Sequence, residues 1–275
     1  MPNTPLGRRG LLRVAVAALA AGGSLSRGFP ETAGDGRHRL DRAHEPMLRA
    51  PVVAANGNKV PLVVEMAHPM EAGHYIRSVE VTRARDPIPS KGSFHFTPAN
   101  GQVFLAFQSR MDEGPGEVVV TAECSMHGRF SGRPAPVTVA DGTGGCAGPA
   151  ASDPPRALDL RPPEIRLPAV LRGGGVHPGE VFDVQVGVAH PNRTGLTRRD
   201  GRFVATGEPF HLTRIEIWYD EEPVSWFLTT PALSDNPLLT FRLRVQHDGL
   251  LRVVATNTRE QRLTATVPVR LDSPG

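Results

Sequence analysis

The chain has 275 residues, 39% of them hydrophobic, and is long enough for two ordinary domains that each have a core. Its net charge is +3, but residues 1–28 hold four arginines and no acid, so the rest of the chain carries about −1. The basic character therefore belongs to the N-terminal segment, and the composition gives no reason to expect binding to nucleic acid.

Residues 1–28 have the pattern of an export signal. Arg8 and Arg9 precede a mildly apolar run rich in alanine and glycine at residues 14–23, which is typical of a twin-arginine signal peptide. A membrane span requires about 20 apolar residues, and this run is too short for one. We expect the segment to be cut off, the mature protein to lie in a bacterial periplasm, and the chain to have no membrane span.

Beyond the signal, the pattern predicts an all-β protein. Residues 29–57 show no period and predict a loosely ordered arm, whereas residues 58–140 contain short β-type runs separated by turn residues. Residues 141–163 are rich in glycine and proline and predict a linker. Residues 164–272 again hold short runs, with cleaner period-two alternation. Two immunoglobulin-like antiparallel β-sandwiches joined by a Gly/Pro-rich linker are the expected fold.

The two β-rich parts echo each other in sequence. The segment Val64–Met70 is similar in sequence to Val186–Asn192, and the similarity places His68 and His190 at equivalent positions before a proline. Repetition of one sandwich unit explains the echo. Either histidine has the chemistry for a metal or catalytic role, but a turn histidine bonded to nearby backbone is the favoured interpretation.

The chain contains two cysteines, Cys124 and Cys146. Cys124 shares one face of a predicted strand with Val120 and Ala122, so we expect a small buried apolar residue. Its spacing to His127 resembles that of a metal site, but two ligands cannot close a tetrahedral zinc site. We therefore expect no metal or cofactor site. A disulfide between the two cysteines remains an alternative, although two cysteines make a poor framework for a chain with its own cores.

Cys146 stands on a stem of very small residues: Gly144 and Gly145 precede it, and Ala147 and Gly148 follow. Because glycine permits nearly every backbone conformation, we expect a flexible arm that moves its thiol through solvent as a tethered nucleophile. No basic residue lies within several positions, which predicts an ordinary thiol that becomes activated only inside a partner. The alternative is a cysteine stranded in a linker between domains.

Several motifs resemble the Sox sulfur-carrier proteins. Residues 58–148 resemble SoxY and residues 176–271 resemble SoxZ. The resemblance is carried by the segments Asp86–Pro89, Phe94–Gly101, Gly144–Cys146, Ala189–Gly195, Phe210–Trp218 and Asp235–Leu238.

The resemblance implies a pair of immunoglobulin-like domains that associate, with Cys146 as the covalent attachment point for sulfur intermediates. It implies a carrier that is not itself a catalyst. Its partners would be periplasmic Sox-type enzymes: a c-type cytochrome that couples thiosulfate to the cysteine, a hydrolase that releases sulfate, and a sulfur dehydrogenase.

Two departures from the usual Sox pattern matter. Ala147 replaces a glycine and the chain continues through Pro149, so the arm is held at both ends. The SoxY-like and SoxZ-like parts are also fused, which resembles the SoxYZ-like carriers associated with quinoprotein dehydrogenases. An accessory carrier of such a dehydrogenase is therefore one alternative function.

Two further alternatives are a purely structural pair of immunoglobulin-like modules and a cysteine hydrolase. A hydrolase would need a histidine and an acid held against Cys146, which a swinging arm cannot supply. Between the domains we expect sheet packed against sheet, with Trp218, Trp226 and Phe227 as candidate anchors. The apolar strand positions expected to be divided between core and partner are Val184, Val186, Ile215, Ile217 and Phe241.

Overall fold

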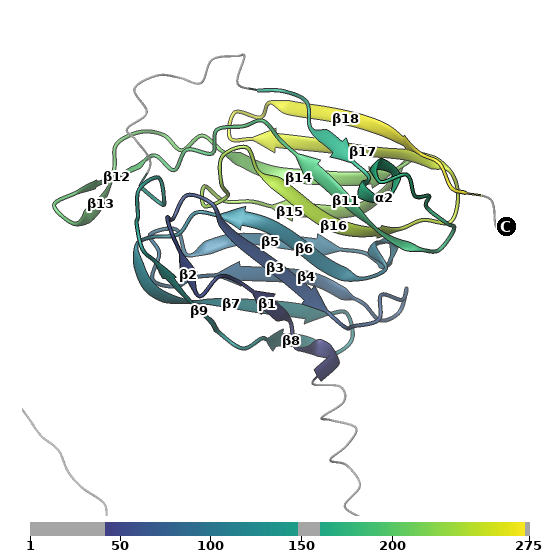
Figure 1. Ribbon diagram of the computed structural model, residues 1–275, viewed down its shortest axis with the longest axis horizontal. Helices are drawn as coiled ribbons and strands as arrows, with labels where there is room; N and C mark the ends of the chain where they lie inside the picture. The colour runs from purple at the N-terminus through teal and green to yellow at the C-terminus, as the bar shows by residue number, and fades with distance from the viewer. Residues whose placement is uncertain (1–41, 148–159, 273–275) are drawn as a thin grey trace, which may run out of the picture.

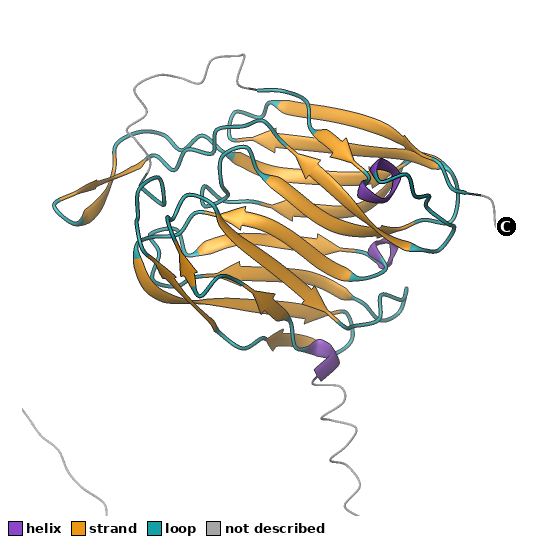
Figure 2. Cartoon of the chain, in the orientation of Figure 1, coloured by secondary structure: helices purple, strands orange, loops and turns teal. Residues whose placement is uncertain are grey.

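A computed structural model describes residues 42–147 and 160–272 of the chain. These residues form two layers of β-sheet with very little helix (Figure 2), as the all-β prediction requires. Within these two ranges, no helix is both long and apolar enough to cross a bilayer. The expected export signal, residues 1–28, lies outside the described residues.

The first half of the chain supplies nine strands. They are β1 (Met47–Arg49), β2 (Val53–Ala54), β3 (Val60–Met66), β4 (Ile76–Thr82), β5 (Ser90–Phe96), β6 (Val103–Ser109), β7 (Gly114–Cys124), β8 (Gly128–Ser131) and β9 (Ala135–Val139). In β3 and β6, buried residues alternate with more exposed ones, because successive side chains of a strand point to opposite faces. β1 and β2 lie in the expected loose arm, yet they pair with β3 and β9, so this part of the arm belongs to the sandwich.

The second half supplies the remaining strands and one short helix. They are β10 (Glu164–Arg166), α2 (Pro168–Leu171), β11 (Val181–Gly187), β12 (Leu196–Arg199), β13 (Arg202–Ala205), β14 (Leu212–Tyr219), β15 (Glu222–Leu228), β16 (Leu238–Arg244), β17 (Gly249–Asn257) and β18 (Arg262–Val269). β11 alternates strictly between buried and half-buried positions, as its sequence predicted. The hairpin of β12 and β13 projects away from the sheets (Figure 1).

The sheets run without a break from one half into the other. One sheet has the order β1-β3-β6-β16-β11-β10, and the other has β18-β17-β14-β15-β5-β4-β7-β9-β2 with β8 also on β7. The halves therefore meet edge to edge, through the antiparallel pairs β6–β16 and β5–β15 (Figure 1). The expected face-to-face packing of two separate sandwiches is wrong, because each half uses its open strand edges to extend the other.

The strand order repeats on either side of this junction. β3 flanks β6 as β11 flanks β16, and β4 flanks β5 as β14 flanks β15. Because both junction pairs are antiparallel, the two halves are related by an approximate two-fold rotation. The echo seen in the sequence thus reflects a repeated unit that pairs with itself.

Aromatic side chains fill the junction. Phe227 on β15 is fully buried, and its ring lies 5.5 Å from that of Phe94 and 5.6 Å from that of Phe241. On the other face of the same strand pair, the Trp226 and His95 rings stack with centroids 5.0 Å apart. Phe227 and Trp226 are therefore anchors of the junction. Trp218 instead lies beneath the Arg252 guanidinium, within the second half.

Candidate functional site

The thiol of Cys146 is buried in this structure. Its exposed fraction is 0%, and both Cys146 and Cys124 are free thiols, so the alternative of a disulfide between them is wrong. The expected mobility of the arm stays a prediction, and the thiol does not lie in solvent in this structure. The reason lies in contacts made by residues far away in the sequence, which hold the glycine-rich arm against the body of the protein.

Backbone hydrogen bonds fold the arm back on the first half. The Gly57 amide donates to the Asp141 carbonyl at 2.8 Å, and the Gly145 amide donates to the Gly142 carbonyl at 2.9 Å. The Arg110 guanidinium donates to the carbonyls of Gly144 and Gly145. This guanidinium is almost fully buried, so it holds the stem in one position.

The second half of the chain completes the enclosure of Cys146. The Thr194 hydroxyl, in the segment Ala189–Gly195, donates to the Cys146 carbonyl at 2.7 Å. Asp235, also from the second half, pairs with Arg110 at 2.7 Å. Both residues belong to segments that resemble SoxZ, so the SoxZ-like half contacts the arm directly.

The glycines of the arm let its backbone approach the body of the protein closely, in addition to permitting flexibility. Gly144 has φ +69°, a conformation that glycine adopts without strain. A Cβ on Gly145 would stand 2.4 Å from the Met111 carbonyl oxygen, so only glycine lets the backbones come this close. Ala147 borders an open groove of about 380 Å³ between the arm and Arg198. Gly148, the last expected arm residue, lies outside the described residues.

A buried charge network lies behind the arm. Asp86 accepts from Lys91 Nζ at 2.6 Å and pairs with Arg83, and all three side chains have no exposed surface. Lys91 also donates to the Arg110 carbonyl at 2.9 Å, which links the network to the residue that holds the stem. These mutual contacts satisfy charges that would otherwise be costly to bury.

The surroundings make Cys146 less acidic than an ordinary thiol. Burial raises its pKa to about 11; Lys91 opposes the increase, while Asp86 and Asp112 add to it. The expectation of an ordinary pKa therefore fails in the direction of lower reactivity. Since the thiolate is the attacking form, this buried environment makes Cys146 less reactive.

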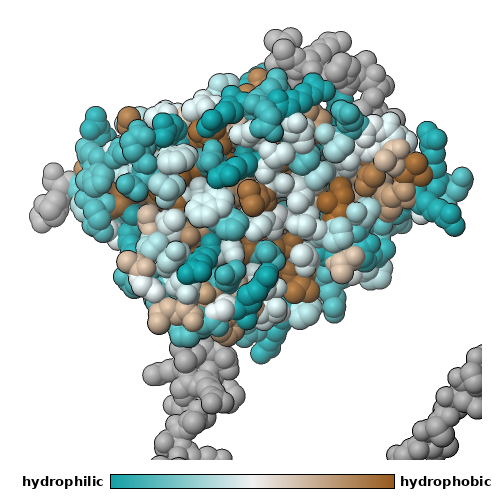
Figure 3. All heavy atoms as spheres, turned by 180° about the vertical axis from the view of Figure 1, so that it is seen from behind, coloured by the Kyte–Doolittle hydropathy of each residue, from teal (hydrophilic) through white to brown (hydrophobic). Residues whose placement is uncertain are grey.

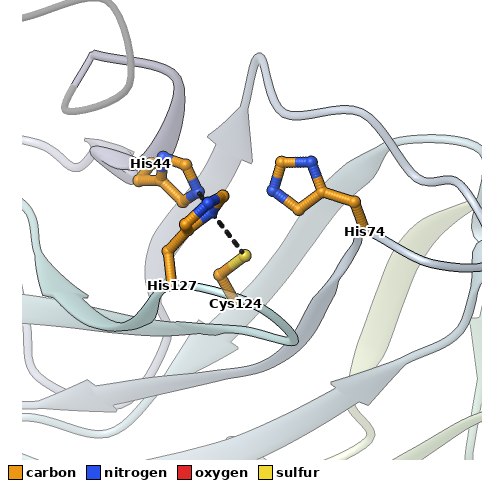
Figure 4. A group of neighbouring side chains, drawn as sticks. All are labelled: His44, His74, Cys124 and His127. Atoms are coloured by element: carbon orange, nitrogen blue, oxygen red, sulfur yellow. Dashed lines mark hydrogen bonds between the residues drawn. The ribbon is translucent and has the colours of Figure 1, made fainter. Parts of the chain in front are cut away.

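A second group of side chains lies at the other end of the first half. His44, His74, Cys124 and His127 point toward one another (Figure 4), and their donor atoms all lie within 4.8 Å of one another. Cys124 is buried, as its strand position predicted. Sequence reasoning considered only Cys124 and His127 and missed His44 and His74, because these come from the expected arm and from the β3–β4 loop.

The two histidines of the repeat have different surroundings. His190 is a turn histidine whose ring contacts the side chains of Asn192 at 3.0 Å and Asn257 at 3.3 Å. The Nδ1 atom of His68 bonds to the Pro69 carbonyl, as expected, but its Nε2 faces the histidine group. Burial, followed by the neighbouring imidazoles, lowers the pKa of His68 to about 4, so this ring is neutral at pH 7.

The solved structures to which the chain is similar share little sequence with it. A superoxide reductase (neelaredoxin) from Ignicoccus hospitalis is 20% identical, with 46% of this chain and 89% of that chain covered and a TM-score of 0.32. The fibronectin(III)-like modules of Clostridium thermocellum CbhA are 11% identical, cover 82% of this chain and 94% of theirs, and give a TM-score of 0.25. No curated protein matches the chain.

Two protein families match the chain in tandem. "Sulfur oxidation protein SoxY" matches residues 32–146 and ends on Cys146, and "Sulphur oxidation protein SoxZ" matches residues 173–268. Both are carrier or accessory proteins rather than catalysts. The order and extent of the two matches agree with the two paired halves of the fold, and the chain belongs to the SoxY–SoxZ sulfur-oxidation carrier family, with both domains in one polypeptide.

Proposed function

We propose that this protein is a periplasmic sulfur carrier that holds sulfur intermediates covalently on Cys146. The observation that carries the proposal is the free thiol at the end of the SoxY match, on a segment that hydrogen bonds hold outside both sheets. A carrier must offer its thiol to several enzymes, and a small-residue stem gives the thiol access to recessed active sites.

The arm opens before it is loaded. Opening breaks the Thr194 and Arg110 contacts and returns Cys146 to water, where the effect of burial on its pKa is lost. The pKa then falls toward its ordinary value of 9.0, so a larger fraction of the thiol is thiolate. A docking enzyme thus gains a reactive sulfur, while the closed carrier keeps it from unwanted oxidation.

Loading with thiosulfate is a two-electron oxidation. A sulfur–sulfur bond forms between Cys146 Sγ and the outer sulfur of thiosulfate, the thiol proton goes to solvent, and two electrons pass to a c-type cytochrome partner. A hydrolase then adds water across the bond between the outer sulfur and the sulfonate. Hydrogen sulfate leaves, and Cys146 retains a persulfide that a sulfur dehydrogenase oxidises further.

Mass spectrometry tests the attachment site. The purified protein is incubated with thiosulfate and an oxidised Sox-type c-type cytochrome, and its peptides are then mapped. We expect a thiosulfonate adduct on Cys146 that is absent from Cys146→Ser and present in Cys124→Ser. An adduct on Cys124 alone, or none on the wild-type protein, contradicts the proposal.

Closed-arm contacts are tested through the reactivity of Cys146. Thr194→Val removes the hydrogen bond to the Cys146 carbonyl, worth about 1 kcal/mol, and the bond that the hydroxyl accepts from the Leu196 amide. We expect Cys146 to react about 5-fold faster, or more, with a thiol reagent under native conditions. Gly145→Ala should also make Cys146 react faster, because its added Cβ would press on the Met111 carbonyl oxygen. Thr213→Val, which removes a hydroxyl bonded to the Thr256 carbonyl, is the control and leaves the rate unchanged. Equal rates in all four proteins contradict an arm held by these contacts.

Fusion of the two domains, with the arm continuing past Ala147, favours a second candidate: the accessory carrier of a periplasmic quinoprotein dehydrogenase. Binding of the purified protein to such a dehydrogenase and to a Sox-type cytochrome, compared side by side, separates the two candidates. Preference for the dehydrogenase, together with an adduct that forms without thiosulfate, supports the second.

A further inference from the structure

Five metal-binding side chains converge at one end of the first half, in a place that sulfur carriage on Cys146 does not use. They come from four separate segments of the chain. His44 lies on the helical turn at residues 42–44, His68 and His74 in the β3–β4 loop, Cys124 at the end of β7, and His127 in the turn before β8. Folding therefore brings together donors that sequence spacing keeps apart.

The four imidazoles are arranged as a ring. Adjacent ring centroids are 4.5 Å apart for His44–His68 and His68–His74, and 4.8 Å apart for His74–His127 and His127–His44. Each ring stands at 72–88° to its neighbours. When four imidazoles bind one metal ion in its equatorial plane, with metal–nitrogen bonds of about 2.1 Å, the centroids of adjacent rings lie about 4.5 Å apart.

The donor atoms have the spacing of a coordination sphere. His44 Nε2 lies 3.1 Å from His68 Nε2 and 3.0 Å from His127 Nδ1. Nitrogens bound at right angles to one ion are about 3.0 Å apart, whereas tetrahedral ligands are about 3.4 Å apart. Cys124 Sγ lies 3.6 Å from both His68 Nε2 and His127 Nδ1.

The hydrogen bonds of His68 and His74 show how these two rings face the centre of the group. The carbonyl of Pro69 can only accept a hydrogen bond, so His68 Nδ1 donates to it at 2.6 Å, and His68 Nε2 faces inward, toward His44 Nε2 and Cys124 Sγ. His74 Nε2 is buried and has no hydrogen-bond partner. A cation bound at the centre would give His74 Nε2 the partner that it lacks.

We propose that His44, His68, His74 and His127, with Cys124 as the fifth ligand, bind a divalent transition metal ion. Imidazole nitrogens and a thiolate suit iron, cobalt, nickel, copper and zinc rather than magnesium or calcium. Four imidazoles near right angles plus one sulfur make a square-pyramidal set with a sixth position open. This set favours Fe(II) or Co(II) over zinc, which takes four ligands in a tetrahedron. His127 is exposed, so an ion reaches the site from solvent.

Metal titration of the full-length protein tests the site. Metal-free protein is titrated with Co(II), and anaerobically with Fe(II), while absorption and thermal melting are recorded. We expect one ion per chain, a sulfur-to-cobalt charge-transfer band, weak five-coordinate d–d bands and a higher Tm. Cys124→Ser loses the charge-transfer band, and His127→Ala, at an exposed position, binds about 100-fold more weakly or worse.

Two control variants test whether the thiol of Cys146 or a histidine on the surface contributes to metal binding. Cys146→Ser and His177→Ala, the latter at an exposed position away from the group, bind metal as the wild type does. Circular dichroism verifies that each variant is folded. Absence of binding by the folded wild-type protein, or a band that depends on Cys146, overturns the proposal. Intense tetrahedral cobalt bands overturn the five-ligand arrangement.

Discussion

At the scale of single residues, the buried charges behind the arm give a sharp prediction. Lys91→Met keeps the bulk of the side chain but leaves Arg83 as the one remaining ion-pair partner of Asp86, at a position where all three side chains have no exposed surface. Because breaking a buried pair leaves an uncompensated charge, we expect unfolding to become easier by about 3 kcal/mol in urea denaturation.

Arg129→Met is the matched control for that loss of charge. It removes the partner of Glu80 in an ion pair whose side chains are each about half exposed. Exposed pairs contribute less than about 1 kcal/mol, so the free energy of unfolding should hardly change. Similar losses in both variants would show that burial of Lys91 has no special importance.

Cys146 predicts a dependence of stability on alkaline pH. Its pKa is about 11 in the folded protein against an ordinary value of 9.0, so the folded state binds the proton more tightly. This contribution is fully present below pH 9 and is lost as the pH rises through 11. Between pH 8 and 10.5, wild-type protein should lose about 2 kcal/mol more than Cys146→Ser.

Urea denaturation of both proteins at each pH measures this difference. Tyr219, whose pKa burial raises to about 12, is common to both proteins, so its effect cancels in the comparison. Parallel curves for the two proteins would mean that the thiol is not buried in solution.

At the scale of strands, the paired edges predict that the two halves unfold together. Phe227 on β15 contacts Phe94 across the β5–β15 pair and Phe241 on β16. Phe227→Ala should cost about 3–5 kcal/mol while the protein still unfolds in one transition. Phe203→Ala, on the projecting β12–β13 hairpin, should cost much less. Two separate transitions in the wild-type protein would contradict a shared core.

The strands themselves were predictable because their burial has period two, as in β6 and β11. Their pairing across the junction was not, because alternation tells which residues face inward but not which open edges meet. The role of Cys124 shows the same limit. Its burial followed from its strand position, whereas His44 and His74 reach it only through tertiary contacts.

The position of Cys146 was the least predictable feature. Local sequence predicted a free stem, but Arg110 and Thr194, 36 residues before and 48 residues after the cysteine, hold that stem closed. Glycine permits both a mobile stem and a tightly packed one. Composition alone therefore does not distinguish between them.

At the scale of the whole molecule, the continuous sheets predict that the covalent connection is dispensable for assembly. A protease site placed between residues 147 and 160 and then cleaved should leave one complex on size-exclusion chromatography, because β5–β15 and β6–β16 still join the halves. Cys146 should also stay slow to react, since Thr194 contacts it without help from the connection. Separation of the halves at micromolar concentration would contradict this expectation.

The outer surface agrees with a protein whose main apolar contacts are already made inside the chain. On the face seen in Figure 3, the hydrophobic residues lie in small separate groups among polar ones. This face offers no broad apolar area of the size that permanent subunit interfaces use. The apolar strand edges that other proteins bury against a second subunit are here joined within one molecule.

The tight enclosure of Cys146 has a consequence for the proposed transfer of sulfur between enzymes. With the thiol fully enclosed and the Met111 carbonyl already pressed against the stem, no space remains for an added sulfur bearing a sulfonate. Under the proposed function, an empty carrier holds its stem against the body of the protein, whereas a loaded carrier would have to keep it extended. Enzymes that load such a carrier and enzymes that unload it would then meet two different shapes of the same protein.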